Sequence, residues 1–129
     1  MAVFGVGTDI IEIARISDIL SRGDRFLDRV LTANEREYLR LRGMKHESVA
    51  SMWCAKEAVA KAIGTGIRGF EMKDIEIIHD DLGKPAVLLH SGASETAERL
   101  GAGSILLSIS HCRQYAVAMC VIEKREGAL

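Results

Sequence analysis

Three charged residues in two separate segments have the side chains needed to act on a phosphate ester. Glu57 and Lys61 are four residues apart in a segment with helical periodicity, so both should lie on one face of a helix. Asp9 follows a glycine-rich stretch near the N-terminus. Because Mg2+ usually takes one or two carboxylates and completes its shell with waters and substrate phosphate oxygens, Asp9 and Glu57 predict a magnesium site beside Lys61.

Each of these residues also has a simpler structural interpretation. Glu57 and Lys61 stand in the favoured order for an exposed helical ion pair, which contributes only about 0.2–0.5 kcal/mol. Asp9 could cap the helix that follows it. The sequence therefore leaves open whether Asp9 and Glu57 meet in space.

A glycine run directly follows the helix that carries Glu57 and Lys61. Backbone N–H groups of Gly64, Thr65 and Gly66 could bind anionic groups. A helix C-terminus repels anions, so a phosphate there would need Lys61 or a metal ion as compensation. The run matches neither a Walker loop nor a dinucleotide-binding motif, so it is weak evidence when taken alone.

Other polar residues have an ordinary structural interpretation. His111 at a strand end is typical of a turn or a hydrogen-bonded histidine, and Lys84 is typical of a solvated turn residue. Lys56, next to Glu57, is expected to be a solvated charge. The remaining histidines lack metal-ligand spacing, which argues against a zinc site: His46, His79 and His90.

Arginine is concentrated in the segment 15–42, which contains no lysine. The simplest interpretation of its first half is a solvated helix face with nearby acidic partners such as Glu12 and Asp18. The functional interpretation is a docking surface for an acidic protein, because complementary charge accelerates association. The arginines of this candidate surface are Arg15, Arg22, Arg25 and Arg29.

The elements that would position these residues begin with a strand at 3–10, in which Gly5, Gly7 and Asp9 alternate with larger residues. The glycines leave one face bare, so a chain segment or a ligand can approach the backbone closely. The pattern over 13–30 predicts two short helices interrupted at Gly23 and Asp24. Thr32 and Glu35 have capping-box spacing and predict a helix up to about residue 42.

The segment 47–63 gives the strongest helix signal, because it is rich in alanine and ends at Gly64. Hairpins are predicted from 74–79 with 86–90, and from 105–110 with 115–123, with a short helix at 94–100 between them. The chain should therefore adopt an α+β fold in one domain over residues 1–129, with an antiparallel sheet wrapped around one long helix and with short N-terminal helices.

Composition excludes several classes of protein. The net charge of −1 argues against a nucleic-acid binder. The apolar stretches are too short to cross a membrane, and the N-terminus lacks a basic signal-peptide region. Three cysteines without a CxxC pair indicate a reducing, cytoplasmic location.

Five motifs occur in order along the chain: GVGTDIIEI at 5–13, LTANE at 31–35, AKEAVAKAIGTGI at 55–67, GKP at 83–85 and SISH at 108–111. Together they strongly resemble the holo-(acyl-carrier-protein) synthase family, the small bacterial type of 4'-phosphopantetheinyl transferase. The resemblance covers nearly the whole chain, from about Val3 to Glu123. The combination of an early GxDI with KEAxxKAxGTG is its most specific part.

The resemblance implies transfer of the 4'-phosphopantetheine arm of coenzyme A to a serine of apo acyl carrier protein, with release of adenosine 3',5'-bisphosphate, in fatty acid biosynthesis. Asp9 and Glu57 match the magnesium ligands of the family, and Lys61 matches the lysine near the transferred phosphate. The resemblance also implies that residues outside the Glu57–Lys61 helix line the coenzyme A site: Lys84, Pro85, Ser108, Ser110 and His111. Members form homotrimers with active sites between subunits. Their first helix docks the acidic carrier, and its matches here are Arg15, Arg22, Arg25, Phe26 and Arg29.

One departure from the family pattern concerns the residues before AKEA. They commonly read Arg-Phe-Ala, whereas this chain has Met52, Trp53 and Cys54. The role of that arginine therefore does not carry over, although Trp53 keeps a bulky aromatic ring.

The sequence leaves the proton acceptor open. Glu57, or a metal-bound water held near Glu35 or Asp9, could take the proton of the attacking serine. Two alternative functions also remain: a magnesium-dependent phosphohydrolase acting on a nucleotide diphosphate, and a carrier-protein-binding module without catalysis.

Overall fold

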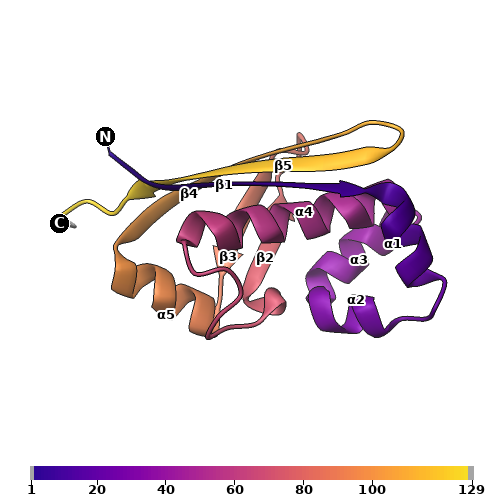
Figure 1. Ribbon diagram of the computed structural model, residues 1–129, viewed down its shortest axis with the longest axis horizontal. Coiled ribbons are helices and arrows are strands. Elements are labelled where there is room, and N and C mark those ends of the chain that lie inside the picture. The colour runs from indigo at the N-terminus through magenta and orange to yellow at the C-terminus, as the bar shows by residue number, and fades with distance from the viewer. Residues whose placement is uncertain (1, 128–129) are drawn as a thin grey trace.

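The computed structural model describes residues 2–127. The first element is a long strand, and four helices follow it. Two strands, a fifth helix and two further strands complete the order (Figure 1). The elements are β1 (Val3–Glu12), α1 (Ile13–Leu20), α2 (Arg25–Val30), α3 (Ala33–Leu41), α4 (His46–Ile63), a short 3-10 turn η1 (Met72–Asp74), β2 (Ile75–His79), β3 (Pro85–Leu89), α5 (Ser91–Leu100), β4 (Ala102–His111) and β5 (Tyr115–Lys124). Within the described part of the chain, no helix is both long and apolar enough to cross a membrane.

The strands form two antiparallel sheets around α4, which confirms the predicted α+β fold. The larger sheet has the order β1-β5-β4 and lies along one side of α4, while the β2-β3 hairpin crosses behind α4 in this view and β3 contacts β4 (Figure 1). The expected single sheet is thus divided in two. The first strand pairs with the last, and Asp9 stands opposite Ala118 of β5.

Helix α4 forms the centre of the core. Its 18 residues include a run of buried small and branched side chains, and it ends at Gly64 with φ 99°, the left-handed conformation that glycine adopts without strain. The two predicted N-terminal helices and their break at Gly23 are present as α1 and α2. The predicted capping box at Thr32 and Glu35 is also present at the start of α3.

The large sheet has two different faces. Side chains facing α4, such as Ile11, Ala118 and Ile122, belong to the hydrophobic core. The opposite face exposes large apolar side chains on all three strands: Val6, Ile10, Leu106, Tyr115, Val117 and Met119. Exposed apolar patches of this kind mark interaction surfaces in many proteins.

Candidate functional site

Close contact between β1 and α4 positions the candidate site. A methyl group at Gly5 would overlap the carbonyl oxygen of Ala62, and one at Gly7 would overlap that of Ala58. Glycine is therefore required at both positions for the strand to lie directly on the helix. Asp9 is the next residue on the same face of β1, so the same contact places its carboxylate against α4.

The structure brings the three predicted residues together in one pocket of about 420 Å³. Lys61 Nζ donates to the carbonyl oxygen of Thr8 at 2.9 Å and lies 3.2 Å from Asp9 Oδ1. Glu57 lines the same pocket. The pKa of Glu57 is raised by burial and by the negative charge of Asp9, while Lys61 acts in the opposite direction.

This arrangement fits a divalent metal ion. Asp9 and Glu57 supply only carboxylate oxygens, which are the ligands that Mg2+ prefers. Repulsion from Asp9 contributes, after burial, to the raised pKa of Glu57, and a bound cation would offset that repulsion. Residues 2–127 contain no group of three or more His, Cys, Asp and Glu side chains suited to a metal, so a metal here would take two protein ligands and complete its shell with water or phosphate.

The pocket continues towards α1 and α2. Beyond the acids it is lined by apolar side chains that include Ile19, Phe26 and Trp53. The rings of Phe26 and Trp53 are 5.4 Å apart. Ile19 and Phe26 also line a neighbouring pocket of about 520 Å³, so the two hollows share a wall.

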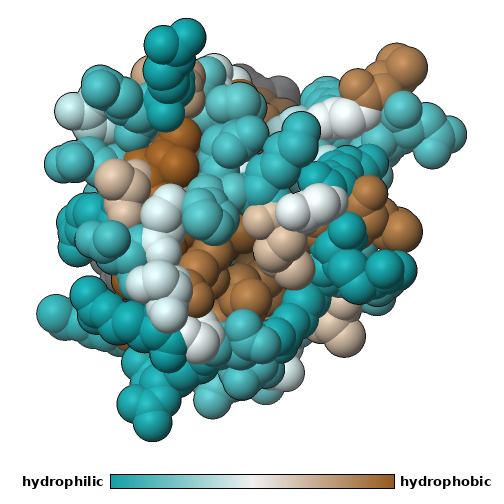
Figure 2. Space-filling view, turned by 90° about the vertical axis from the view of Figure 1, so that its right-hand side faces the viewer, coloured by the Kyte–Doolittle hydropathy of each residue, from teal (hydrophilic) through white to brown (hydrophobic). Residues whose placement is uncertain are grey.

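The second hollow contains the predicted docking surface. Arg22, Arg25 and Arg29 line it together with Phe26, and Arg15 lines the pocket that holds the acids. Figure 2 views the molecule from the end that carries α1 and α2, and it shows apolar surface in a hollow ringed by hydrophilic residues. Among residues 2–127, none of these four arginines forms an ion pair with an acidic side chain. The predicted pairing with Glu12 and Asp18 is therefore absent from that part of the chain.

The other predicted binding residues lie elsewhere. His111 lines a separate pocket of about 270 Å³ with Met52 and with Gly83, the neighbour of Lys84. Ser108 and Ser110 are exposed on the sheet face that points away from α4. Lys84 is the last residue of the turn between β2 and β3, and Pro85 is the first residue of β3. The residues of the glycine run (Gly64, Thr65 and Gly66) are not among those that line the pocket with Asp9.

Comparison with known proteins identifies the family to which the chain belongs. A model described as the 4'-phosphopantetheinyl transferase superfamily matches residues 5–120. The chain belongs to this superfamily.

Individual relatives are similar over nearly their full length. The holo-(acyl-carrier-protein) synthase of Clostridium novyi (strain NT) is 47% identical over 121 residues, which cover 94% of this chain and 88% of the relative. The crystal structure of the holo-(acyl-carrier-protein) synthase from Neisseria meningitidis is 37% identical, has a TM-score of 0.88, and is matched over 95% of this chain and 99% of that one. The Helicobacter pylori synthase, solved in complex with coenzyme A, is 31% identical with a TM-score of 0.82, over 92% and 99% of the two chains.

Two sequence interpretations of this transferase were wrong. Lys56, expected to be a solvated charge, is 0% exposed and lies 2.7 Å from Glu35 Oε1. Glu35 is equally buried; it accepts hydrogen bonds from the backbone N–H groups of Thr32 and Ile77. It cannot hold a water for the acids in the pocket, which removes it as a contributor to proton transfer.

One residue near the site of the transferase was missed. Cys54 lies on α4, and its pKa is raised to about 12, mainly by burial and also by the negative charge of Asp9. Its Sγ also lies 3.4 Å from the carbonyl oxygen of Ala116. The sequence indicated that Cys54 lies near the site only through its position, three residues before Glu57 on the same helix.

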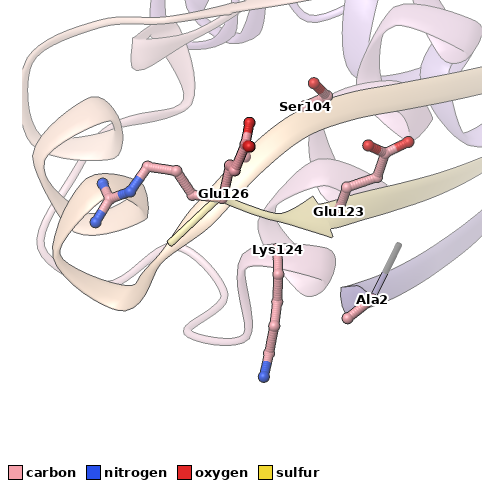
Figure 3. Close-up of a pocket in the computed structure, with 7 residues that line it drawn as sticks. Ala2, Ser104, Glu123, Lys124 and Glu126 are labelled. Carbon is pink, nitrogen blue, oxygen red and sulfur yellow. The ribbon is translucent and has the colours of Figure 1, made fainter. Parts of the chain in front are cut away.

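A further hollow of about 550 Å³ lies where the start of β1 meets the end of β5. Its labelled charged side chains, Glu123, Lys124 and Glu126, point in different directions rather than towards one centre (Figure 3). It shares no lining residue with the pocket that contains Asp9.

Proposed function

We propose that this protein is a holo-(acyl-carrier-protein) synthase. It transfers the 4'-phosphopantetheine group of coenzyme A to a serine of apo acyl carrier protein and releases adenosine 3',5'-bisphosphate, a step that supplies holo carrier to fatty acid biosynthesis. One observation carries the proposal: the pocket with two acids and a lysine shares a wall with the arginine-rich hollow. A carrier docked on the arginines would therefore present its serine towards Asp9, Glu57 and Lys61.

The acids are proposed to hold Mg2+. When bound, this ion would neutralise the diphosphate of coenzyme A and polarise its P–O bonds. Asp9 and Glu57 would fix its position from β1 and α4, two elements held together by the glycines of β1. Lys61 would contact the phosphate, where its ammonium group can stabilise the departing bisphosphate.

The proton of the attacking serine would pass to Glu57 or to a water between Glu57 and Asp9. Glu57 is better placed than Glu35, because it lines the same pocket as Asp9 and Lys61 and is therefore within reach of a serine that enters there. Glu35 is excluded by its pairing with Lys56.

The carrier is proposed to bind the docking surface of α1 and α2. The arginines are exposed and surround Phe26, so they offer positive charge around an apolar centre. Such a surface suits an acidic helical partner, because the charges steer the encounter while the apolar centre supplies contact area. Two charge reversals, Arg22→Glu and Arg25→Glu, should mainly lower the association rate and its dependence on salt.

We further propose a homotrimer in which two chains complete each active site. Within one chain, Asp9 and His111 line different pockets, so a coenzyme A molecule that contacts both would have to lie between subunits. The exposed apolar face of the large sheet would be covered by assembly. Met119→Glu should therefore yield smaller species in sedimentation velocity, together with loss of transfer activity.

A mass measurement tests the proposed function directly. Incubation with coenzyme A, Mg2+ and apo carrier should add phosphopantetheine to the carrier. Asp9→Asn should abolish transfer while carrier binding persists, whereas Glu95→Gln, which removes an exposed acid from α5, should leave transfer unchanged. An unmodified carrier with free nucleotide products would indicate a phosphohydrolase. Carrier binding without either reaction would indicate a binding module.

The three cysteines are all free thiols in the described residues. This suits the reducing cytoplasm that we propose as the location of the enzyme.

A further inference from the structure

Lys61 makes a contact that a substrate-binding lysine does not need. Its ammonium group reaches from α4 to two adjacent residues of β1, the carbonyl oxygen of Thr8 at 2.9 Å and Asp9 Oδ1 at 3.2 Å. The Asp9 side chain is 16% exposed, whereas that of Lys61 is 52% exposed. Lys61 therefore has room to move while Asp9 is held in place.

The contact places Lys61 in competition with a divalent cation for the same carboxylate oxygen. A metal ion bound to Asp9 Oδ1 would lie only a few ångströms from the ammonium group, and like charges at that separation repel strongly in a partly buried site. Lys61 would have to leave Asp9 for the metal to bind tightly. In leaving, it would give up both hydrogen bonds to β1 unless another acceptor replaced them.

The diphosphate of coenzyme A is such an acceptor. It carries several anionic oxygens, so it can bind the ammonium group of Lys61 and the metal ion at the same time. Glu57, which lines the same pocket and is repelled by Asp9, gains from the metal once Lys61 has moved. The two binding events are then linked through one side chain.

We propose that Lys61 is the resting counter-ion of Asp9 and makes metal binding depend on the diphosphate. The metal alone binds weakly because Lys61 holds Asp9, and it binds tightly after the diphosphate has drawn Lys61 away. This inference rests on the proposed function, which supplies the metal and coenzyme A. Thermodynamic reciprocity requires the metal to tighten coenzyme A binding by the same factor.

Mn2+ titrations followed by electron paramagnetic resonance test the inference without any turnover. Free Mn2+ is measured with the protein alone and with coenzyme A, and a titration of coenzyme A without protein corrects for direct complexation. Lys61→Met should bind Mn2+ alone more tightly than the wild type by at least about fivefold, the lower end of typical coupling factors. Lys61→Arg, which keeps the charge, should stay close to the wild type.

Arg15→Met is the matched control, because Arg15 lines the same pocket but makes no ion pair with Asp9 among residues 2–127. It should change Mn2+ affinity much less than Lys61→Met. Equal effects of the two variants would show that only the total charge of the pocket matters and would overturn the inference.

Two further results would contradict it in distinguishable ways. If coenzyme A tightens Mn2+ binding to the wild type but Lys61→Met binds Mn2+ alone no better, the coupling comes only from phosphate ligands, and the inference fails while the proposed function stands. If Mn2+ binds neither protein even with coenzyme A, the proposed metal site fails as well. A melting curve for each variant establishes that the proteins compared are folded.

Discussion

The buried pair of Lys56 and Glu35 gives the sharpest test of how this fold is held together. Lys56 projects from α4 on the side away from the large sheet, and its Nζ lies 2.7 Å from Glu35 Oε1. The same ammonium group donates to the carbonyl oxygens of Val30 at 2.8 Å, Met72 at 3.1 Å and Ile75 at 2.7 Å. One side chain thus connects the end of α2 and the segment from η1 to β2 with the central helix.

Replacing Lys56 by methionine should be severely destabilising. The substitution leaves the carboxylate of Glu35 buried without its partner, a change that typically costs about 3–5 kcal/mol. The three carbonyl groups also lose their donor, although their contributions do not simply add. Against a total free energy of unfolding of about 5–15 kcal/mol for a domain of this kind, the loss is a large fraction.

The double variant should recover much of this loss. Burial lowers the pKa of Lys56 even though the charge of Glu35 acts to raise it, so the cost of burying the ammonium group is substantial. Lys56→Met combined with Glu35→Gln removes both buried charges and should be markedly more stable than Lys56→Met alone.

Urea unfolding followed by circular dichroism measures these differences for both single variants and the double variant. Lys124→Met is the control, because Lys124 is exposed, and it should change the free energy of unfolding by less than about 0.5 kcal/mol. If Lys56→Met were as mild as Lys124→Met, the pair would not support the fold. If the double variant were no more stable than Lys56→Met, the unpaired carboxylate would not be the source of the loss.

Three further predictions concern other parts of the molecule. Gly7→Ala should lower the free energy of unfolding by about 3 kcal/mol or more in urea titrations, because the methyl group meets the backbone of α4, whereas Thr8→Ala on the exposed side of β1 should have little effect. Cys112 is exposed, and backbone N–H groups lower its pKa, while burial raises the pKa of Cys120 to about 12; a thiol reagent at pH 8 should modify Cys112 quickly and Cys120 only on unfolding. For Glu76, burial tends to raise the pKa, but hydrogen bonds from neighbouring side chains outweigh it and lower the pKa. Glu76→Gln should therefore destabilise the protein at pH 7. In acid titrations of stability this difference should shrink once the pH drops below the ordinary pKa of glutamate, and it should be lost as the pH falls through the lowered folded-state pKa, where the ionised form disappears.

Local signals in the sequence predicted the helices well. The capping box at Thr32 and Glu35, the break at Gly23 and the left-handed Gly64 each act over a few residues, so their consequences can be read from neighbouring positions alone. The hairpin formed by β4 and β5 was predicted for the same reason, although both strands extend beyond their expected bounds.

Contacts between distant segments were harder to predict. Alternation along β1 indicated a strand but not its pairing with β5, because register depends on which partner completes the sheet. The contact of Asp9 with α4 likewise depended on packing between segments far apart in sequence, and the family resemblance, rather than spacing, made Asp9 and Glu57 a pair.

Lys56 shows how a local interpretation fails. Its helical neighbours Met52, Val59 and Ala60 are all buried, so the lysine lies on an apolar face of α4. This pattern in the sequence could have indicated that Lys56 is buried and not solvated. A buried lysine requires a partner, and Glu35, which also completes the capping box of α3, supplies it.

The two sides of β1 link the site to the exposed face of the sheet. Gly7 and Asp9 point towards α4, whereas Ile10 points outward and is 64% exposed. Since side chains alternate along a strand, the pairing of Asp9 with Ala118 fixes both the approach of the carboxylate to Glu57 and the exposure of Ile10. A slip of one residue would exchange the two and lose the site. A partner that covers the outward face would therefore also hold the strand that carries Asp9, so the proposed assembly and the proposed metal binding should stabilise each other.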